Sequence, residues 1–358
     1  MSVYTLRSLV ATIAAFCIGA PSVAACPASQ IALPWPTEGW THGAPEDDVD
    51  GAQLQSGVNG TFASSAARAR ALLVIHRGRM VVERYGDGRG PQSRLLSHSI
   101  AKFILGTAIG VLVGQGRLDL DAPVSGFAPR HRLLTIRHLM TMRSGLAWNE
   151  AYTNLASDLP ETMLGHGRLD QARYVATMAQ AQAPGARFSY SSGDANLLSG
   201  VVRDRLGSGQ AYARFLRTEL FEPLGLTSAE PGFDASGTFV GSSWFWATAQ
   251  DYARIGYLHL SCGMSNGRRL LPEDWHSVVL QPSDAVTDGH NGYGALATLF
   301  SDGAYGHTGF RGQLLLIDEA RDLVIVRFAD TGGDAAAEQA LRTSIESVRA
   351  AFPRRHDS

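Results

Sequence analysis

The sequence predicts an α/β (α+β) fold in which an all-helical domain is inserted into a discontinuous sheet domain. Apolar runs typical of strands occur at 71–85 and again at 314–328, near the two ends of the chain. Between 125 and 284, apolar residues recur mainly at helical spacing. We therefore expect a sheet domain made of 61–124 and 285–358, with 125–284 as the helical insert.

The individual elements follow from local patterns along the chain. Two runs, Ala71–His76 and Met80–Tyr85, flank a short Gly-containing turn and predict a tight hairpin. The apolar stretch from 99 to 113 predicts a buried helix, which ends at glycines. Further helices are predicted at 135–142, 169–181, 195–206, 209–221, 248–260 and 334–351, and further strands at 314–317 and 323–328.

Composition excludes several classes of protein. The chain has 358 residues, of which 45% are hydrophobic and 18% charged, so it can bury a sizeable core and is not disordered. Its formal net charge of −2 lacks the basic excess that binding to a phosphate backbone requires. We therefore expect a globular protein that does not bind nucleic acid.

The first 25 residues have the layout of a secretory signal peptide. An uncharged apolar run from Leu9 to Ala20 is followed by the small residues Val23, Ala24 and Ala25. This run is too short for a permanent membrane span, and no later apolar run reaches about 18 residues. We therefore expect a periplasmic or secreted protein, whose residues 26–60 form an N-terminal extension without a clear period.

Two cysteines remain after this leader, Cys26 and Cys262. In an oxidising compartment an even pair favours a disulfide, so Cys26–Cys262 is a disulfide candidate. Cys26 also directly follows Val23-Ala24-Ala25, which resembles a lipoprotein box. The alternative is therefore a lipid anchor at Cys26 and a membrane-anchored lipoprotein.

Ser99 and Lys102 form the most informative pair in the sequence. Lys102 is the single lysine in a chain that otherwise uses arginine, and lysine, unlike arginine, can lose its proton when it is desolvated. It lies three residues after Ser99 at the start of the predicted buried helix, so both side chains share one helix face. Serine needs a base to act as a nucleophile, and a neutral Lys102 could serve as that base.

Two further motifs follow in order. Tyr190 stands ahead of a predicted helix and could act as an acid or base beside the lysine. His307-Thr308-Gly309 opens a predicted strand, and its glycine allows the backbone to approach a ligand closely. Each of these residues, taken alone, is more often structural than catalytic.

In this order the three motifs resemble the serine β-lactamase and penicillin-binding protein superfamily. The whole chain after the leader fits this resemblance, which is closest to the class C-like branch with its esterases and 6-aminohexanoate-dimer hydrolases. Its segments 143–152 and 190–194 are similar to the last of these groups. The resemblance implies a β-lactamase-like fold, with an antiparallel sheet flanked by helices around an inserted helical domain.

The resemblance also implies roles for individual residues. Ser99, Lys102 and Tyr190 would be catalytic, and the main-chain amides of Ser99 and Phe310 would form an oxyanion hole. Substrate binding would fall to Ser192, His307, Thr308, Gly309, Trp148 and Tyr152. The sequence has no metal-binding spacing of histidines and cysteines, so we expect neither a metal nor another cofactor.

Two departures from the class C pattern bear on the substrate. Ser192 stands where an asparagine would be expected, and His307 stands where a lysine would hold the carboxylate of a β-lactam. We therefore expect a periplasmic serine hydrolase that cleaves a small-molecule ester or amide through an acyl-enzyme. The alternatives are a peptidoglycan D,D-peptidase or weak β-lactamase of the same fold, and a non-catalytic envelope binding protein.

Overall fold

The computed structural model describes residues 35–124, 126–152, 154–285 and 291–355. The predicted leader 1–25 and Cys26 lie outside these residues, so the signal peptide and the lipid anchor stay predictions. Cys262 is disulfide-bonded, but because its predicted partner Cys26 is not among the described residues, the pairing also stays a prediction. Within the described residues, no helix combines the length and the apolar character needed to cross a membrane.

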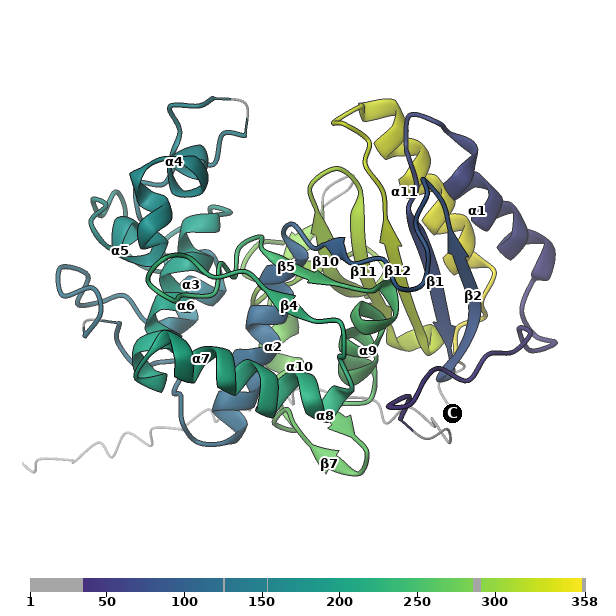
Figure 1. Ribbon diagram of the computed structural model, residues 1–358, viewed down its shortest axis with the longest axis horizontal. Helices are drawn as coiled ribbons and strands as arrows, with labels where there is room; N and C mark the ends of the chain where they lie inside the picture. Colours follow the sequence, from purple (N-terminus) through teal and green to yellow (C-terminus); the bar gives the residue numbers. More distant parts are fainter. Residues whose placement is uncertain (1–34, 125, 153, 286–290, 356–358) are drawn as a thin grey trace, which may run out of the picture.

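A seven-stranded antiparallel sheet forms one lobe of the molecule, in the order β2-β1-β12-β11-β10-β9-β8 (Figure 1). Its strands are β1 (Ala71–His76), β2 (Arg79–Tyr85), β8 (Gly292–Tyr293), β9 (Thr298–Leu299), β10 (Tyr305–Gly309), β11 (Gln313–Asp318) and β12 (Leu323–Phe328). The predicted hairpin is confirmed, and Arg77 and Gly78 both have positive φ in its two-residue turn. The predicted strands at 314–317 and 323–328 are confirmed as well.

Alternating side chains of the central strands enter two separate cores. Leu73 and Ile75 of β1 face the core that is shared with α2 (Ile100–Gly114) and α9 (Ala249–Leu260), whereas Leu72 and Val74 face α1 (Gly51–Ala63) and α11 (Ala335–Ala350). Helices α1 and α11, far apart in the sequence, lie side by side on the outer face (Figure 1). The sheet is therefore covered by helices on both faces.

Helix α1 corrects one expectation from the sequence, because residues 51–60 were assigned to an extension without a clear period. The helix begins after Asp50, whose side chain accepts a hydrogen bond from the Gln53 amide. It packs on α11 through Gly57, where a Cβ atom would meet the Val348 nitrogen at 2.7 Å. This contact uses a glycine rather than an apolar stripe, so the hydrophobic pattern of the segment is weak.

The second lobe is helical and lies between β3 and α9 along the chain (Figure 1). Its elements are α3 (Ile136–Met140), α4 (Asp158–Leu164), η1 (His166–Leu169), α5 (Gln171–Ala176), α6 (Ser192–Leu206), α7 (Gly209–Phe215), η2 (Leu216–Phe221) and α8 (Glu222–Leu224). The predicted insert 125–284 also contains α9, which packs on the sheet rather than in this lobe. Gly256 allows that contact, since a Cβ atom there would lie 2.6 Å from Val324 Cγ1.

The remaining elements are short. They are β3 (Leu95–Leu96), β4 (Glu230–Pro231), β5 (Phe245–Ala247), β6 (Met264–Ser265), β7 (Arg268–Arg269), α10 (Trp275–Leu280) and η3 (Glu319–Arg321). Strand β3 pairs with β5, and the Ser97 amide donates to the Phe245 carbonyl. The segment that leads into α2 is therefore fixed before the helix begins.

Candidate active site

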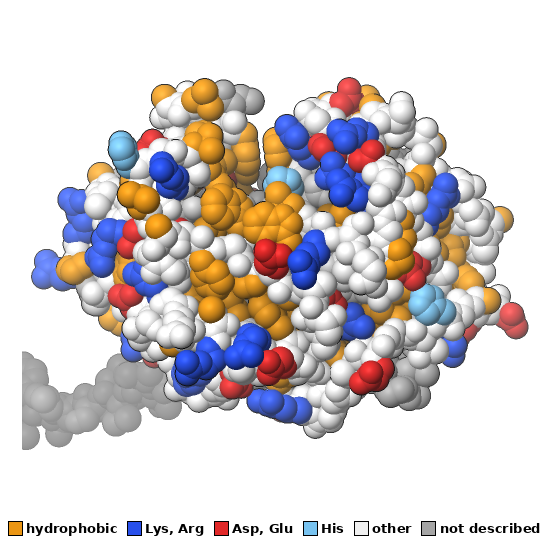
Figure 2. Space-filling view, viewed as in Figure 1, with side chains coloured by type: hydrophobic (Ala, Val, Ile, Leu, Met, Phe, Trp, Pro, Cys, Tyr) orange, Lys and Arg blue, Asp and Glu red, His pale blue; other side chains and the backbone are white. Residues whose placement is uncertain are grey.

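A pocket of about 500 Å³ lies between the lobes, and Ser99 is on its wall. Tyr152 and Tyr190 line it from the helical lobe, and Thr308 and Phe310 line it from the end of β10. Figure 2 shows the corresponding notch, with hydrophobic side chains along its left side and floor and charged side chains gathered on its right side. The site is therefore assembled from segments distant in the sequence.

Ser99 stands at the N-cap position of α2 without a capping hydrogen bond from its side chain, and α2 is buried along most of its length. The residue before it, His98, has φ of 45°, a left-handed conformation that non-glycine residues rarely adopt. The Ser97 hydroxyl donates to the Ser243 carbonyl and ties this turn to the segment before β5. Such local strain at the start of α2 is held by its surroundings and commonly marks a functional site.

Lys102 is fully buried one turn into α2, directly below Ser99. Its Nζ lies 3.2 Å from Ser99 Oγ, 3.1 Å from Ser192 Oγ and 2.9 Å from the Ser242 carbonyl oxygen. Burial lowers the pKa of Lys102 from its ordinary value to about 8, and the charge of Glu150 acts in the opposite direction. With this pKa, about a tenth of the lysine is neutral at pH 7.

Glu150 completes this cluster from the helical lobe. One of its carboxylate oxygens accepts from the Ser192 hydroxyl at 2.7 Å, and the other accepts from the Ser192 amide at 2.8 Å. The Trp148 indole and the Tyr152 hydroxyl also donate to it. Ser192 and Trp148 therefore contact Glu150 and are not among the residues that line the pocket, and the substrate-binding role that the resemblance implies for them stays a prediction.

These contacts determine where the lone pair of a neutral Lys102 points. The Ser242 carbonyl can only accept, and the Ser192 hydroxyl gives its single proton to Glu150 and so must accept from the lysine. Both protons of a neutral amine are then used. Its lone pair is left for Ser99, which is the arrangement that a general base requires.

Tyr190 lies on the other side of the lysine, with Lys102 Nζ 4.9 Å from the centre of its ring. Burial raises the pKa of Tyr190 well above its ordinary value, and a hydrogen bond with Ser99 works against this shift. The phenol therefore keeps its proton near neutral pH. The structure thus brings Ser99, Lys102 and Tyr190 together, as the sequence predicts.

His307 lies behind Tyr190 and is almost completely buried. Its Nε2 is 3.3 Å from the Tyr293 hydroxyl, and burial, with the nearby charge of Lys102, lowers its pKa to about 3. This histidine is therefore neutral at physiological pH and supplies no cation to a substrate. His307, Thr308 and Gly309 all line the pocket, and their role in substrate binding stays a prediction.

The opposite wall is formed by Phe310, which directly follows β10 and is 41% exposed. Its ring stacks on Tyr152 at 5.2 Å with an angle of 7° between the rings. Gly309 lies so close to the segment between β3 and α2 that a Cβ atom would meet the Ser97 carbonyl oxygen at 2.7 Å. This contact brings the peptide that carries the Phe310 amide beside the Ser99 segment.

The sequence missed two functional groups in this site. Glu150 stands inside a segment that was noted for its resemblance, but no short-range pattern connects it with Ser192, 42 residues away. The Ser242 carbonyl is a main-chain group and leaves no signal in the sequence. Among the described residues, no cluster of three or more histidines, cysteines, aspartates or glutamates could hold a metal ion.

Comparison with known proteins places this geometry in context. The family model described as Beta-lactamase matches residues 58–350. The 6-aminohexanoate-dimer hydrolase of Paenarthrobacter ureafaciens is 26% identical over 289 residues, which cover 72% of each chain.

Solved structures share the fold. A proposed 6-aminohexanoate-dimer hydrolase from Bacillus anthracis superposes with a TM-score of 0.69, at 21% identity and 87% coverage of both chains. A family VIII carboxylesterase superposes with a TM-score of 0.66, at 14% identity, covering 86% of this chain and 99% of its own.

Proposed function

Because the chain belongs to the Beta-lactamase family, we propose that it is a serine hydrolase that cleaves an ester or amide bond of a small molecule through an acyl-enzyme. The 26% identical relative is named as a hydrolase of the 6-aminohexanoate dimer, and a similar fold is found in a carboxylesterase. Both names describe hydrolysis of a carbonyl derivative. They support this class of reaction for the present chain.

In the proposed acylation step, Ser99 Oγ attacks the carbonyl carbon of the substrate and Lys102 Nζ takes the hydroxyl proton. The amides of Ser99 and Phe310 donate to the oxygen that becomes negative. The carbon–oxygen or carbon–nitrogen bond to the leaving group then breaks. Tyr190 gives its proton to the leaving group and regains one from Lys102.

Deacylation repeats the sequence with water as the nucleophile. The water attacks the acyl carbon and gives a proton to the base, and the bond to Ser99 Oγ breaks as Oγ is protonated again. The carboxylic acid product leaves, and the enzyme returns to its starting state. The proposed reaction consumes only water and requires no oxidant, reductant or cofactor.

The observation that carries the proposal is the bonding of Lys102. A buried amine with a pKa of about 8 has two fixed acceptors and directs its remaining position at Ser99, 3.2 Å away. A protein that merely binds ligands has no need for a desolvated lysine beside a serine, since burial of its charge is unfavourable. This argues against the non-catalytic binding protein.

The neutral His307 favours esters and simple amides over β-lactams. A β-lactam carries a carboxylate, which gains most from a fixed cation at this position of the strand. The location proposed for the activity is the periplasm or the exterior, as the leader-like residues 1–25 suggest. A peptidoglycan D,D-peptidase is the alternative that the same export favours.

A fluorophosphonate probe tests the proposal directly. It is expected to form one adduct, which peptide mapping locates on Ser99, while the Ser99→Ala variant stays unlabelled. The same preparation is then assayed with short-chain p-nitrophenyl esters, an aminohexanoate dimer and a D-Ala-D-Ala peptide. An adduct on another residue, or no ester or amide turnover, would contradict the proposal, and preferred cleavage of the D-Ala-D-Ala peptide would favour the alternative.

A further inference from the structure

The three residues between β10 and β11 are held by their carbonyl groups. The Phe310 carbonyl accepts from Gln313 Nε2 at 2.9 Å, and the Arg311 carbonyl accepts from the Thr331 amide at 3.2 Å. The Gly312 carbonyl accepts from Arg327 Nε at 3.1 Å. We call residues 310–312 the β10–β11 loop. All three of its carbonyls are thus fixed by neighbouring elements.

Gln313 holds the carbonyl of Phe310. It is 3% exposed, and its Nε2 donates to the Ala329 carbonyl at 3.0 Å as well as to Phe310. Its Oε1 accepts from the Ala329 amide at 3.2 Å. Both N–H groups of this amide and its oxygen are therefore used, and they join the loop to the residue that follows β12.

The backbone of the loop needs such support. Arg311 has φ of 65° and Gly312 has φ of 93°, so two consecutive residues adopt left-handed conformations. For Arg311, a residue with a Cβ atom, this conformation is unfavourable by itself. On the amino side, Gly309 is packed against the Ser97 carbonyl oxygen. Phe310 is thus fixed from both sides.

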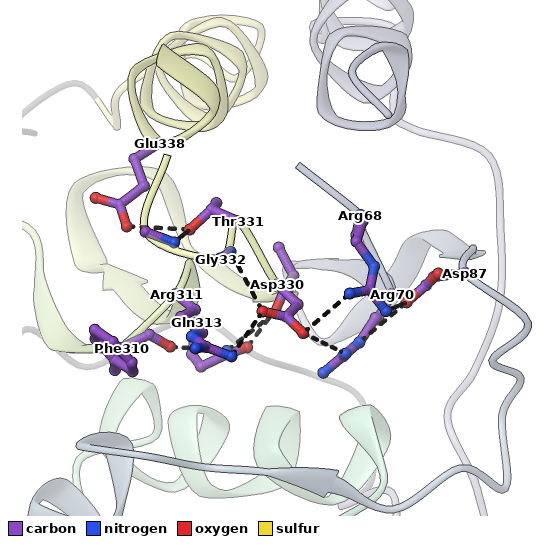
Figure 3. A network of polar contacts seen from close by, with 12 residues as sticks. Arg68, Arg70, Asp87, Phe310, Arg311, Gln313, Asp330, Thr331, Gly332 and Glu338 are labelled. Atoms are coloured by element: carbon purple, nitrogen blue, oxygen red, sulfur yellow. Dashed lines mark hydrogen bonds and ion pairs between the residues drawn. The ribbon is translucent and has the colours of Figure 1, made fainter. Parts of the chain in front are cut away.

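A network of ion pairs also connects the β10–β11 loop to the rest of the sheet lobe. Figure 3 shows Asp330 between the loop and Arg68 and Arg70, which precede β1. Its carboxylate lies 2.8 Å from Arg70 Nη2 and 3.5 Å from Arg311 Nη1. The neighbouring Thr331 hydroxyl donates to Glu338 of α11. The end of β12 thereby joins the loop to two distant parts of the sheet lobe.

We propose that Gln313 is a positioning residue that orients the Phe310 amide toward the oxyanion of the reaction. The inference rests on the proposed function, because it assumes that the Phe310 amide donates to a developing negative charge. The Phe310 carbonyl and amide lie on adjoining peptide planes, so a carbonyl fixed by Gln313 restricts the rotation that sets the direction of the amide. Gln313 itself does not touch the reacting atoms.

The test compares an ester with its thionoester, in which sulfur replaces the carbonyl oxygen. Sulfur accepts hydrogen bonds poorly, so a well-oriented oxyanion hole favours the oxygen ester. The Gln313→Met variant keeps the side-chain length but cannot donate. We expect its kcat/KM for the oxygen ester to fall on the order of 10- to 100-fold, mainly in kcat, and the thionoester to be much less affected.

A matched control is available in the helical lobe. Gln180 Nε2 also donates to two main-chain carbonyls, those of Ser144 and Gln182. The Gln180→Met variant is expected to leave the oxygen-to-sulfur ratio unchanged. All rates are expressed per active site, titrated with the fluorophosphonate, so that partial unfolding of a variant does not distort the comparison.

Each outcome is informative. A ratio in Gln313→Met within about twofold of the wild type would overturn the inference. If that variant does not fold, Gln313→Glu replaces the donating nitrogen with an acceptor at nearly the same size, and a wild-type ratio there would overturn it equally. Failure of the wild type to form the Ser99 adduct would instead contradict the proposed function.

Discussion

The two walls of the pocket are built on different physical principles. Behind one wall, formed by Ser99 and Tyr190, Lys102, Ser192 and Glu150 form a chain of side-chain contacts whose effect depends on which atom carries which proton. On the other wall, the β10–β11 loop presents main-chain groups that do not titrate and are fixed by Gln313 and Arg327. The function of the first wall therefore depends on the protonation states of its side chains. The function of the second wall depends on the geometry of its backbone.

This difference predicts distinct responses to substitution. Substitutions of residues that contact Lys102 should alter the pH dependence of kcat/KM, because Lys102 must be neutral in the free enzyme to accept the Ser99 proton. Changes beside the loop should lower the rate at every pH to the same degree. The following experiments exploit that contrast.

Lys102→Arg should have the largest effect. Arginine preserves the positive charge but cannot supply a neutral nitrogen to accept the Ser99 proton. We expect kcat/KM for a p-nitrophenyl ester to fall at least about 10³-fold. Retention of a tenth of the activity in steady-state assays of the folded variant would show that another group accepts the proton.

Tyr190→Phe removes only a hydroxyl and should rank second. Because the buried phenol stays protonated, its loss deprives the leaving group of an acid. We expect a fall on the order of 10²-fold for an alkyl ester or amide and a smaller fall for p-nitrophenyl esters, whose leaving group needs no proton. Stopped-flow measurement of acylation gives both values, and equal losses would contradict this role.

Substrate preference tests the neutral state of His307. Without a cation, nitrocefin loses a charge-assisted bond of about 1.5–3 kcal/mol, so p-nitrophenyl butyrate should be preferred by at least about 10-fold. Since the pKa of His307 is about 3, the ratio of the two kcat/KM values should stay constant between about pH 5 and 8. A ratio that shrinks on acidification would show that the histidine becomes charged in this range.

Glu150→Gln should change the pH profile more than the maximal rate. Glu150 raises the pKa of Lys102, so removal of its charge lowers that pKa further. Activity rises as Lys102 loses its proton, and the acid limb of kcat/KM should therefore move to lower pH. We expect the maximum to fall only several-fold, since the amide oxygen can still accept from the Ser192 hydroxyl, whereas the contacts of the second oxygen with the Ser192 amide and the Trp148 indole are lost. An acid limb that stays in place or moves to higher pH would refute the coupling.

Asp330→Asn probes the opposite wall and should have the smallest effect. The change weakens the ion pairs of Asp330 with Arg70 and Arg311 but leaves the main-chain contacts of the loop intact. We expect a loss of about threefold in kcat/KM, consistent with a partly exposed ion pair. The acid limb should not move. A displaced limb would show that the two walls are not independent.

The cluster of Ser99, Lys102 and Tyr190 shows what can be predicted from a sequence. Ser99 and Lys102 are one helical turn apart, so local spacing is sufficient to pair them, and the presence of a single lysine in the sequence makes this pair distinctive. Tyr190 was found through the order of motifs in a family. The hydrogen bonds that join Glu150, Ser192 and Lys102 were not predicted. They depend on the direction of the Ser192 hydroxyl proton, which is defined only by contacts in the three-dimensional structure.

The fold shows the same division. Strands β1, β11 and β12 carry continuous apolar runs, and the sequence predicts them closely. Helix α1 was missed, since its contact with α11 depends on a glycine that allows backbones to approach. The placement of α9 was missed too, because its amphipathic pattern shows that one face is buried but not which lobe buries it.

The burial of the single lysine also gives the protein an unusually low reactivity toward compounds that modify amines. Lys102 is the one side-chain primary amine of the sequence, and it is fully buried below Ser99. Amine-reactive dyes or cross-linkers should therefore find almost no target on the folded surface besides a terminal amino group. The rate at which Lys102 is modified would then report how often the structure around the pocket opens. This measurement needs no introduced label.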